Sequence, residues 1–533
     1  MVWIIIEEMK RKSELRTNPI ALSVGRLPPR NDLWNVTNLQ PFFPPIECLF
    51  KTNSLEQVKN YGIKLSDSIV TVSGNVATLS SGRTIDVHPK ITMLLSPFKC
   101  IKGDFGTFGL PMLSEHANEA QKKLQSHNTA GYVGSILSIA LSQSGCQHFP
   151  EVVGVFTGTA LKHTINISDD YEDLSERHWF SQNIGKTFDL KLDEHTGTPI
   201  EYTRSARLPL SLGDEADLGV VEELDVNHTE SSAAEMTPLF HDEEEEAETE
   251  STSDVSTSYI FQIESLASSF DGSICSEESE DEPFAWATFK NVPVQITIME
   301  KLEGTFYELL KTNPESDKHL GWIAQIIFAL AYAQRNFAFT HNDLHGNNIM
   351  FKKTDKEFLY YFHAGITYKV PTYGYLIKII DFDRGIGYIK LPNMKEAKLF
   401  MSDQFDMNEE AGGQYNCQPF FTDKHAVIKP NPSFDLARLA TSLFWDIFPM
   451  GPKYDEYQEQ PLFKMFIKWM TLDDDTSVLF FKNNPKADRY MGFSLYKAIA
   501  RYCKNAIPRK EISELKCFIY DSIVSEQCLV IDI

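Results

Sequence analysis

The segment Thr340–Phe351, THNDLHGNNIMF, carries side chains whose types and spacing could do chemistry. His341, Asp343 and Asn348 form an H-x-D-x-x-x-x-N pattern directly after a stretch with helical periodicity. In phosphoryl transfer, an aspartate at this place accepts the proton of the attacking hydroxyl, and the asparagine five residues on holds a magnesium ion. The spacing therefore predicts Asp343 as a catalytic base and Asn348 as a metal ligand.

A second pattern lies further along the chain, where the apolar run of IKIIDFDRG ends in Asp381, Phe382 and Asp383. An aspartate at a strand end, followed by phenylalanine, matches the D-F-G element, whose aspartate binds magnesium at the β- and γ-phosphates. Asp381 is therefore a second expected metal ligand. Two ligands and a base in this order are more specific than either pattern alone.

Both patterns also have simpler interpretations. Asparagine, aspartate and glycine are common in turns, so HNDLHGNN could be a polar turn after a helix and IIDF an ordinary strand end. His341 and His345 could instead bind zinc. Their spacing would then need a helix, which Gly346 and the three asparagines of this segment disfavour.

Phosphoryl transfer from ATP also needs a lysine on an earlier strand, where it pairs with the α- and β-phosphates. Lys90 ends a V-x-x-K pattern that begins at Val87. A solvated surface lysine is the simpler interpretation, and Lys99 and Lys102 are rivals for the role. Gly74 is the candidate for a turn that covers the nucleotide, because it occupies a strand–turn–strand position ahead of Lys90.

The elements that must position these residues are visible as changes of periodicity. Short apolar runs separated by Ser-Gly pairs predict β-structure from about Leu65 to Lys102, and Val292–Glu300 predicts a buried strand. Apolar residues at helical spacing predict helices over 130–143 and from Trp322 onward. Asn431-Pro432 predicts the N-cap and first residue of another helix, and the C-terminal part reads as mainly helical.

Charge is concentrated in one segment of the 533-residue chain. Residues 214–282 hold 23 acids and no Lys or Arg, whereas the other 464 residues hold 51 acids and 50 bases. The balanced remainder argues against nucleic-acid binding through a broad basic surface. The acidic segment has too little apolar content to fold alone, so it is predicted to be a disordered linker or a tail for a basic partner.

The eight cysteines are scattered without a C-x-x-C pair, which fits a reducing compartment better than a disulfide framework. The sequence has no apolar run approaching the ~18–20 residues that span a bilayer. We therefore expect no membrane partner and a cytoplasmic location.

On these residues the chain resembles the protein kinase superfamily, and more narrowly the divergent serine/threonine kinase-like proteins of large DNA viruses of the iridovirus type. The resemblance covers roughly residues 74–508 without the acidic segment. The stretches that carry it are VHPKITMLLSPFKCIKG, NVPVQITIMEKLEGTFYELL, THNDLHGNNIMF, YKVPTYGYLIKIIDFDRG, GGQYNCQPFF and KPNPSFDLARLATSLF.

The resemblance implies an α+β, two-lobed protein-kinase-like fold with a β-rich N-lobe and a helical C-lobe. Residues 1–60 would form an N-terminal extension, residues 61–300 the N-lobe with its insert at 214–282, and residues 301–533 the C-lobe.

The same resemblance implies ATP and Mg²⁺ as cofactors, bound between the lobes. It assigns Lys90 to the phosphates, and it makes Met299, Glu300 and Lys301 part of a hinge that meets adenine through backbone groups. Asp435 matches the buried aspartate that holds the catalytic-loop backbone, although a solvated aspartate in the first turn of a helix is an equal alternative.

The chain also departs from the protein kinase pattern. Asn342 replaces the arginine of H-R-D, which argues against activation by a phosphorylated loop, and Asp383 replaces the glycine of D-F-G. The predicted helix over 130–143 contains no acid to pair with Lys90, and Glu115 and Glu119 are only upstream substitutes. Residues 360–375 are interpreted as an extra hairpin.

The predicted function is ATP- and Mg²⁺-dependent phosphoryl transfer to serine or threonine of a protein substrate. The first alternative is a pseudokinase that acts as a binding scaffold. The second alternative is a small-molecule kinase of the aminoglycoside or choline type, suggested by the D-L-H tripeptide. If the chain is viral, the expected location is the host cytoplasm or the virion.

Overall fold

The computed structural model describes most of the chain outside one long gap. The described residues are 23–27, 32–40, 61–106, 123–124, 128–193, 284–390, 396–406, 409, 411–422, 425–482, 488–490, 492–522 and 528–531. The acidic segment 214–282, Glu115 and Glu119 lie outside them.

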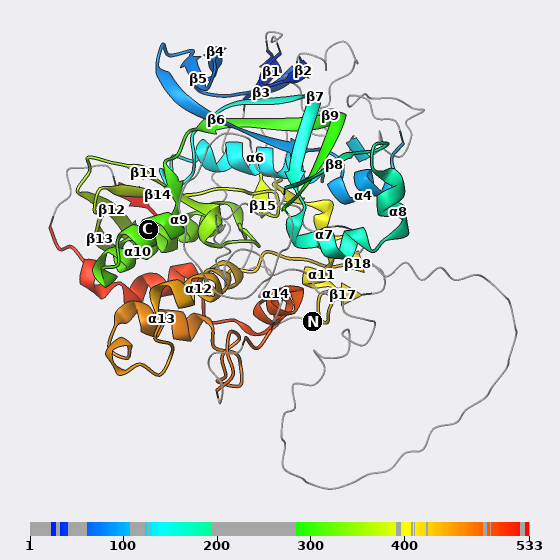
Figure 1. Cartoon of the computed structure of the whole chain (residues 1–533). Helices are drawn as coiled ribbons and strands as arrows, with labels where there is room; N and C mark the ends of the chain where they lie inside the picture. The colour runs from blue at the N-terminus through cyan, green and yellow to red at the C-terminus, as the bar shows by residue number, and fades with distance from the viewer. Residues whose placement is uncertain are drawn as a thin grey trace, which may run out of the picture.

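A mixed α/β architecture results, with a curled antiparallel sheet lying over a mainly helical region (Figure 1). The strand order is β2-β7-β9-β6-β5-β4, and β8 also pairs with β9. The strands are β2 Val36–Gln40, β4 Ile69–Ser73, β5 Val76–Leu79, β6 Thr84–Met93, β7 Val152–Asn166, β8 Asp189–Asp193 and β9 Phe284–Glu300.

Strand β9 is the centre of this sheet and confirms the strand predicted at its C-terminal end. It pairs with β6 in a register that places Lys90 opposite Thr297. The predicted β-structure ends earlier than expected, because Pro97–Lys102 forms helix α4. The Ser96 hydroxyl accepts a hydrogen bond from the Lys99 amide at 3.5 Å and Pro97 takes the first helical position, so the Ser-Pro pair was the signal for this helix.

Helix α6, Ala130–Ser142, confirms the helix predicted over 130–143 and lies beneath the sheet (Figure 1). The Ser135 and Thr297 hydroxyls are 2.8 Å apart, which ties the helix to β9. A Cβ at Gly131 would lie 3.1 Å from the Gln295 side chain, so the glycine permits this close approach. Helices α7, Ser168–Ser175, and α8, His178–Asn183, follow β7.

The range 1–60 contributes two described strands. Strand β1, Ser23–Arg26, pairs with β3, Tyr61–Lys64, and β2 extends the main sheet by pairing with β7. Strand β2 therefore belongs to the main sheet, whereas β1 and β3 form a two-stranded sheet of their own.

The helical region is built around α10, which confirms the helix predicted from Trp322 onward. Its main helices are α9 Phe306–Thr312, α10 Ser316–Phe337, α12 Phe434–Ile447, α13 Pro461–Trp469, α14 Gly492–Tyr502 and α15 Pro508–Glu511. Helix α12 begins two residues later than the predicted first residue Pro432, because the Asn431 side chain accepts from the Ser433 amide in a turn before the helix.

Short strands also occur within this region, and they carry the candidate site. Strand β11, Ile349–Lys353, pairs with β14, Tyr375–Ile379, and with β10, Gly304–Thr305. The further short elements are β15 Ile386–Ile389, β16 Lys398–Met401, α11 Gly412–Tyr415, β17 Phe421–Thr422 and β18 His425–Ala426.

The extra hairpin interpreted from residues 360–375 is present. It consists of β12, Phe358–His363, and β13, Ile366–Pro371, and the C-terminal strand β19, Cys528–Val530, adds to it in parallel. The hairpin therefore forms a three-stranded sheet of its own.

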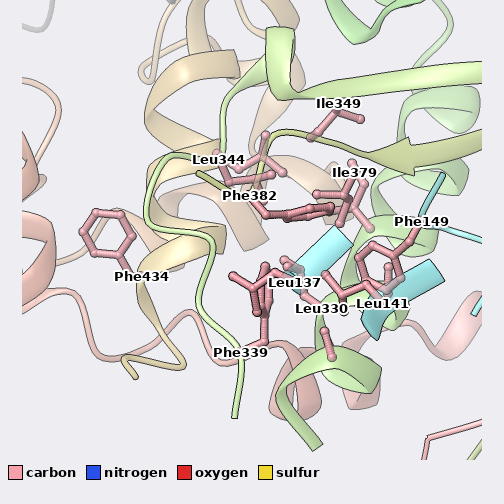
Figure 2. Close-up of a cluster of buried hydrophobic side chains, with 14 of the residues drawn as sticks. Leu137, Leu141, Phe149, Leu330, Phe339, Leu344, Ile349, Ile379, Phe382 and Phe434 are labelled. Carbon is pink, nitrogen blue, oxygen red and sulfur yellow. The ribbon is translucent and has the colours of Figure 1, made fainter. Parts of the chain in front are cut away.

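An apolar cluster joins the two regions at the centre of the molecule (Figure 2). Phe382 is 2% exposed, and its ring centroid lies 6.0 Å from that of Phe149 and 5.8 Å from that of Phe339. Leu137 and Leu141 of α6 point into the same cluster. The phenylalanine after Asp381 therefore anchors that segment by burial.

We predict that Phe382→Ala lowers the free energy of unfolding by about 3–5 kcal/mol, because it leaves a cavity in this cluster. Denaturant unfolding followed by circular dichroism measures the change. Phe481→Ala is the matched control, since Phe481 is 46% exposed, and we expect it to cost much less. Equal losses for the two variants would contradict the proposed anchoring.

Candidate active site

The loop between α10 and β11 is held by a buried carboxylate. Asp435, at the start of α12, is fully buried and accepts hydrogen bonds from the His341 amide at 2.9 and 3.0 Å and from the Asn342 amide at 3.1 Å. Burial raises the pKa of Asp435 to about 6, against the effect of the His341 charge and these amide donors. Of the two interpretations of Asp435, the buried one is correct.

Asn342 connects the same loop to two later segments. Its φ of 64° lies in the left-handed region, which asparagine tolerates better than most residues. Its amide donates to the Arg384 carbonyl at 3.0 Å, and its oxygen accepts from the Tyr415 hydroxyl at 2.5 Å. Neutral hydrogen bonds thus link the loop to the chain beyond Asp381.

Asp343 lies among positive charges. Its Oδ2 is 3.3 Å from Nη1 of Arg384, and its Oδ1 accepts from the Tyr496 hydroxyl of α14 at 2.7 Å. Burial alone would raise the pKa of this carboxyl, but Arg384, His345 and Arg438 hold it well below its usual range. Asp343 therefore stays ionised around neutral pH.

Asn348 ends the short 3₁₀ turn Gly346–Asn348, and its side chain is fixed by the loop itself. Its Nδ2 donates to the Asp343 carbonyl at 2.9 Å and lies 3.2 Å from Nε2 of His345. Because the amide nitrogen is used within the loop, the amide oxygen lies on the other side of the group. This oxygen is the atom of the side chain that could bind a magnesium ion.

Asp381 follows β14 and is tied to the same loop through the backbone. The Ile380 amide donates to the Asn348 carbonyl at 3.0 Å, and His341 Nε2 lies 2.8 Å from the Ile380 carbonyl. These contacts bring together the segments that carry Asp343, Asn348 and Asp381. The His341 and His345 rings each make a hydrogen bond within the site. Among the described residues, no group of three or more His, Cys, Asp or Glu side chains is arranged to hold a metal ion.

Lys90 reaches this cluster from β6. Its Nζ lies 2.8 Å from Oδ1 of Asp381 and 2.8 Å from Oδ1 of Asp383. Both ion pairs join strand β6 to the segment after β14. Burial would lower the pKa of Lys90, but the two carboxylates outweigh it and raise the pKa above its usual range. Lys90 is therefore a charged ammonium within the site.

The rival Lys99 has another partner. It lies on α4, and its Nζ is 2.5 Å from Oε1 of Glu409. Lys102 is the last residue of the same helix. Of the three candidate lysines, the described ion pairs connect Lys90 with Asp381.

The residues expected to contact the nucleotide base lie at the end of β9. Met299 is 8% exposed and opposite His88, while the Glu300 and Lys301 amides donate to the carbonyls of Glu151 and Asp86. Because these two N–H groups are used within the protein, other backbone groups of the segment would have to meet an adenine.

The Glu300 side chain faces the helical region. Its carboxylate lies 2.5 Å from Lys378 Nζ and 2.6 Å from Lys352 Nζ.

Gly74 lies in the turn between β4 and β5 with φ 60°, and a Cβ there would meet no atom within 4 Å. No contact joins Gly74 to Lys90 among the interactions of the described residues.

Three further site residues were not identified from the sequence. Asp383 was noted only as a departure from D-F-G, and it is the second partner of Lys90. Arg384 and Tyr496 were not singled out, and both contact Asp343. The arginine directly after D-F-D was a local signal, whereas Tyr496 lies 153 residues away and gave none.

Comparison with known proteins supports a relationship to protein kinases over one short segment. Fifty-eight residues, 11% of this chain, are 41% identical to the serine/threonine-protein kinase haspin of Mus musculus. The match spans 8% of haspin. No model of a known protein family matches the chain.

Among the described residues, no helix is both long and apolar enough to cross a bilayer.

We predict that His345 titrates with a midpoint of about 4, because burial lowers its pKa more than the Asp343 charge raises it. Since an unfolded histidine titrates near 6.5, this residue makes the free energy of unfolding fall as pH is lowered from about 6.5 towards 4. NMR of histidine-labelled protein measures the midpoint, and His345→Gln identifies the resonance. A midpoint at the unfolded value would contradict the prediction.

Proposed function

We propose that the protein is an ATP- and Mg²⁺-dependent protein kinase that phosphorylates serine or threonine. The observation that carries the proposal is the convergence of Lys90, Asp343, Asn348 and Asp381, which come from β6, from the loop after α10 and from the segment after β14. Their order along the chain and the short similarity to a serine/threonine-protein kinase support it.

The donor set fits the proposed cofactors. Asp381 is 41% exposed at its side chain, which leaves its carboxylate accessible to a metal ion, and the side-chain oxygen of Asn348 would be the second ligand. Lys90 provides a positive charge for the phosphates. When bound, magnesium ATP would supply the phosphoryl group and neutralise charge on its oxygens.

Asp343 would orient the acceptor hydroxyl and take its proton. Arg384 at 3.3 Å fixes the carboxylate, and Tyr496 occupies the other oxygen with its own hydroxyl. An acceptor alcohol must approach an oxygen of the same carboxylate, so Tyr496 marks the place where a substrate hydroxyl would bind.

The proposed fold is the two-lobed kinase fold, with the main sheet and α6 as the N-lobe and the helical region as the C-lobe. The sheet, helix α6 beneath it and the site at the junction support this arrangement. The narrower relationship to kinase-like proteins of large DNA viruses is proposed from the sequence stretches alone, as are the protein substrate and the host cytoplasm or virion.

A scaffold without activity is the second candidate, favoured by one observation. Lys90 is already neutralised by two carboxylates, and α6 offers it no acid. In this alternative the protein would bind partners, a basic one through the acidic segment included, without transferring phosphate.

We predict that Asp343→Asn lowers phosphate transfer to general protein acceptors by at least about 10²-fold, because it removes the base. Transfer from radiolabelled ATP with magnesium, and with EDTA as a blank, measures the effect. Asp455→Asn is the matched control, since Asp455 is exposed on the surface of the helical region.

Three outcomes separate the candidates. Equal transfer by the wild type and Asp343→Asn would overturn the catalytic proposal. Binding of a fluorescent ATP analogue without transfer would support the scaffold. Transfer to an aminoglycoside or to choline, with none to protein, would support a small-molecule kinase.

A further inference from the structure

The ammonium of Lys90 has two acidic partners with different environments. The Asp381 side chain is 41% exposed, whereas that of Asp383 is 16% exposed, and both lie 2.8 Å from Nζ. Asp383 Oδ2 also lies 3.4 Å from the Thr92 hydroxyl, two residues along β6 from the lysine. Asp383 is thus the more enclosed of the two partners and is bonded to β6 at two points.

Helix α6 leaves the space that Asp383 fills. Its sequence, AGYVGSILSIALS, contains no acid. A Cβ at Gly134 would overlap Oδ1 of Asp383 and would lie 3.1 Å from its Cγ and 3.4 Å from its Cα. The carboxylate therefore lies directly against the helix backbone, where any residue larger than glycine would displace it.

The segment after Asp383 is also packed against this helix. A Cβ at Gly385 would lie 2.6 Å from a methyl carbon of Leu137, and one at Gly387 would lie 2.9 Å from the other. Helix α6 and the segment Asp383–Gly387 thus form one packed unit. This packing fixes the position of a carboxylate carried by the segment relative to the helix.

We propose that Asp383 is the positioning residue for Lys90, replacing an acid that α6 does not supply. The inference rests on the proposed phosphoryl transfer. It divides the two carboxylates by role, because Asp381 can turn to a metal ion while Asp383 keeps the ammonium in place for the phosphates. Formation of the Lys90–Asp383 ion pair would then depend on the position of the segment Asp381–Asp383 and not on the position of an acid in helix α6.

The test compares removal of the charge with its relocation. Asp383→Asn keeps the size of the side chain, and Asp383→Gly removes it. The double variant Asp383→Gly/Gly134→Asp puts a carboxylate back from the helix side, into the volume that Asp383 leaves. Asp381→Asn is the comparison for loss of a metal ligand.

We expect Asp383→Asn and Asp383→Gly to lower kcat/KM for ATP by about 10²-fold, mainly through KM. The double variant should recover at least about 10-fold over Asp383→Gly, which mere structural damage would not allow. The KM for magnesium should change in Asp381→Asn and stay close to wild type in Asp383→Asn. If the protein binds nucleotide without transferring phosphate, the affinity for magnesium ATP should fall in Asp383→Asn and Asp383→Gly and recover in the double variant.

Two results would overturn the inference while leaving the proposed function intact. One is an active Asp383→Asn variant with the wild-type KM for ATP. The other is a raised KM for magnesium without rescue by Gly134→Asp, which would make Asp383 a metal ligand. A wild-type protein that neither binds nucleotide nor transfers phosphate would overturn the proposed function itself, and this inference with it.

Discussion

The interaction on which the site depends is the ammonium of Lys90 held between two carboxylates. It joins β6 of the sheet to the segment after β14, across 291 positions of sequence. Of the two carboxylates, that of Asp381 is the more exposed. The two ion pairs therefore close the junction between the sheet and the segment after β14.

The loop after α10 is held by backbone amides that donate to the buried carboxylate of Asp435. Burying the Asp435 carboxylate is unfavourable, and amide donors from His341 and Asn342 offset the cost. Asn342 then binds the Arg384 carbonyl and the Tyr415 hydroxyl. These hydrogen bonds connect the loop after α10 to the chain beyond Asp381.

The electrostatic environment of Asp343 is consistent with the role proposed for it. Arg384 and Arg438 keep the carboxylate ionised, and Tyr496 shows that one of its oxygens accepts a hydroxyl donor. The surrounding charges make this aspartate a weak base in the resting site. Transfer would therefore depend on orientation of the acceptor hydroxyl more than on a raised proton affinity, as expected for phosphoryl transfer.

Much of the local structure followed from sequence pattern. The strand ending at Glu300 and the helices over 130–143 and from Trp322 were predictable because the period of apolar residues differs between strand and helix. The extra hairpin was expected because the segment between Asn348 and Asp381 is longer than the protein kinase pattern requires. The early end of the β-structure was missed, although Ser96-Pro97 was a readable helix start. The start of α12 was placed too early, because Asn and Pro are equally suited to the turn before it.

By itself the sequence determined which chemical groups are available, because residues close in number share one loop or strand end and keep their spacing in any fold. It therefore fixed Asp343 with Asn348, and Asp381 with Phe382 and Asp383. Only the tertiary structure decided which acid Lys90 meets, since that choice depends on the absence of a side chain at Gly134 and on packing between distant segments. No local pattern encodes such a contact, because it exists only when helix, strand and segment lie against one another.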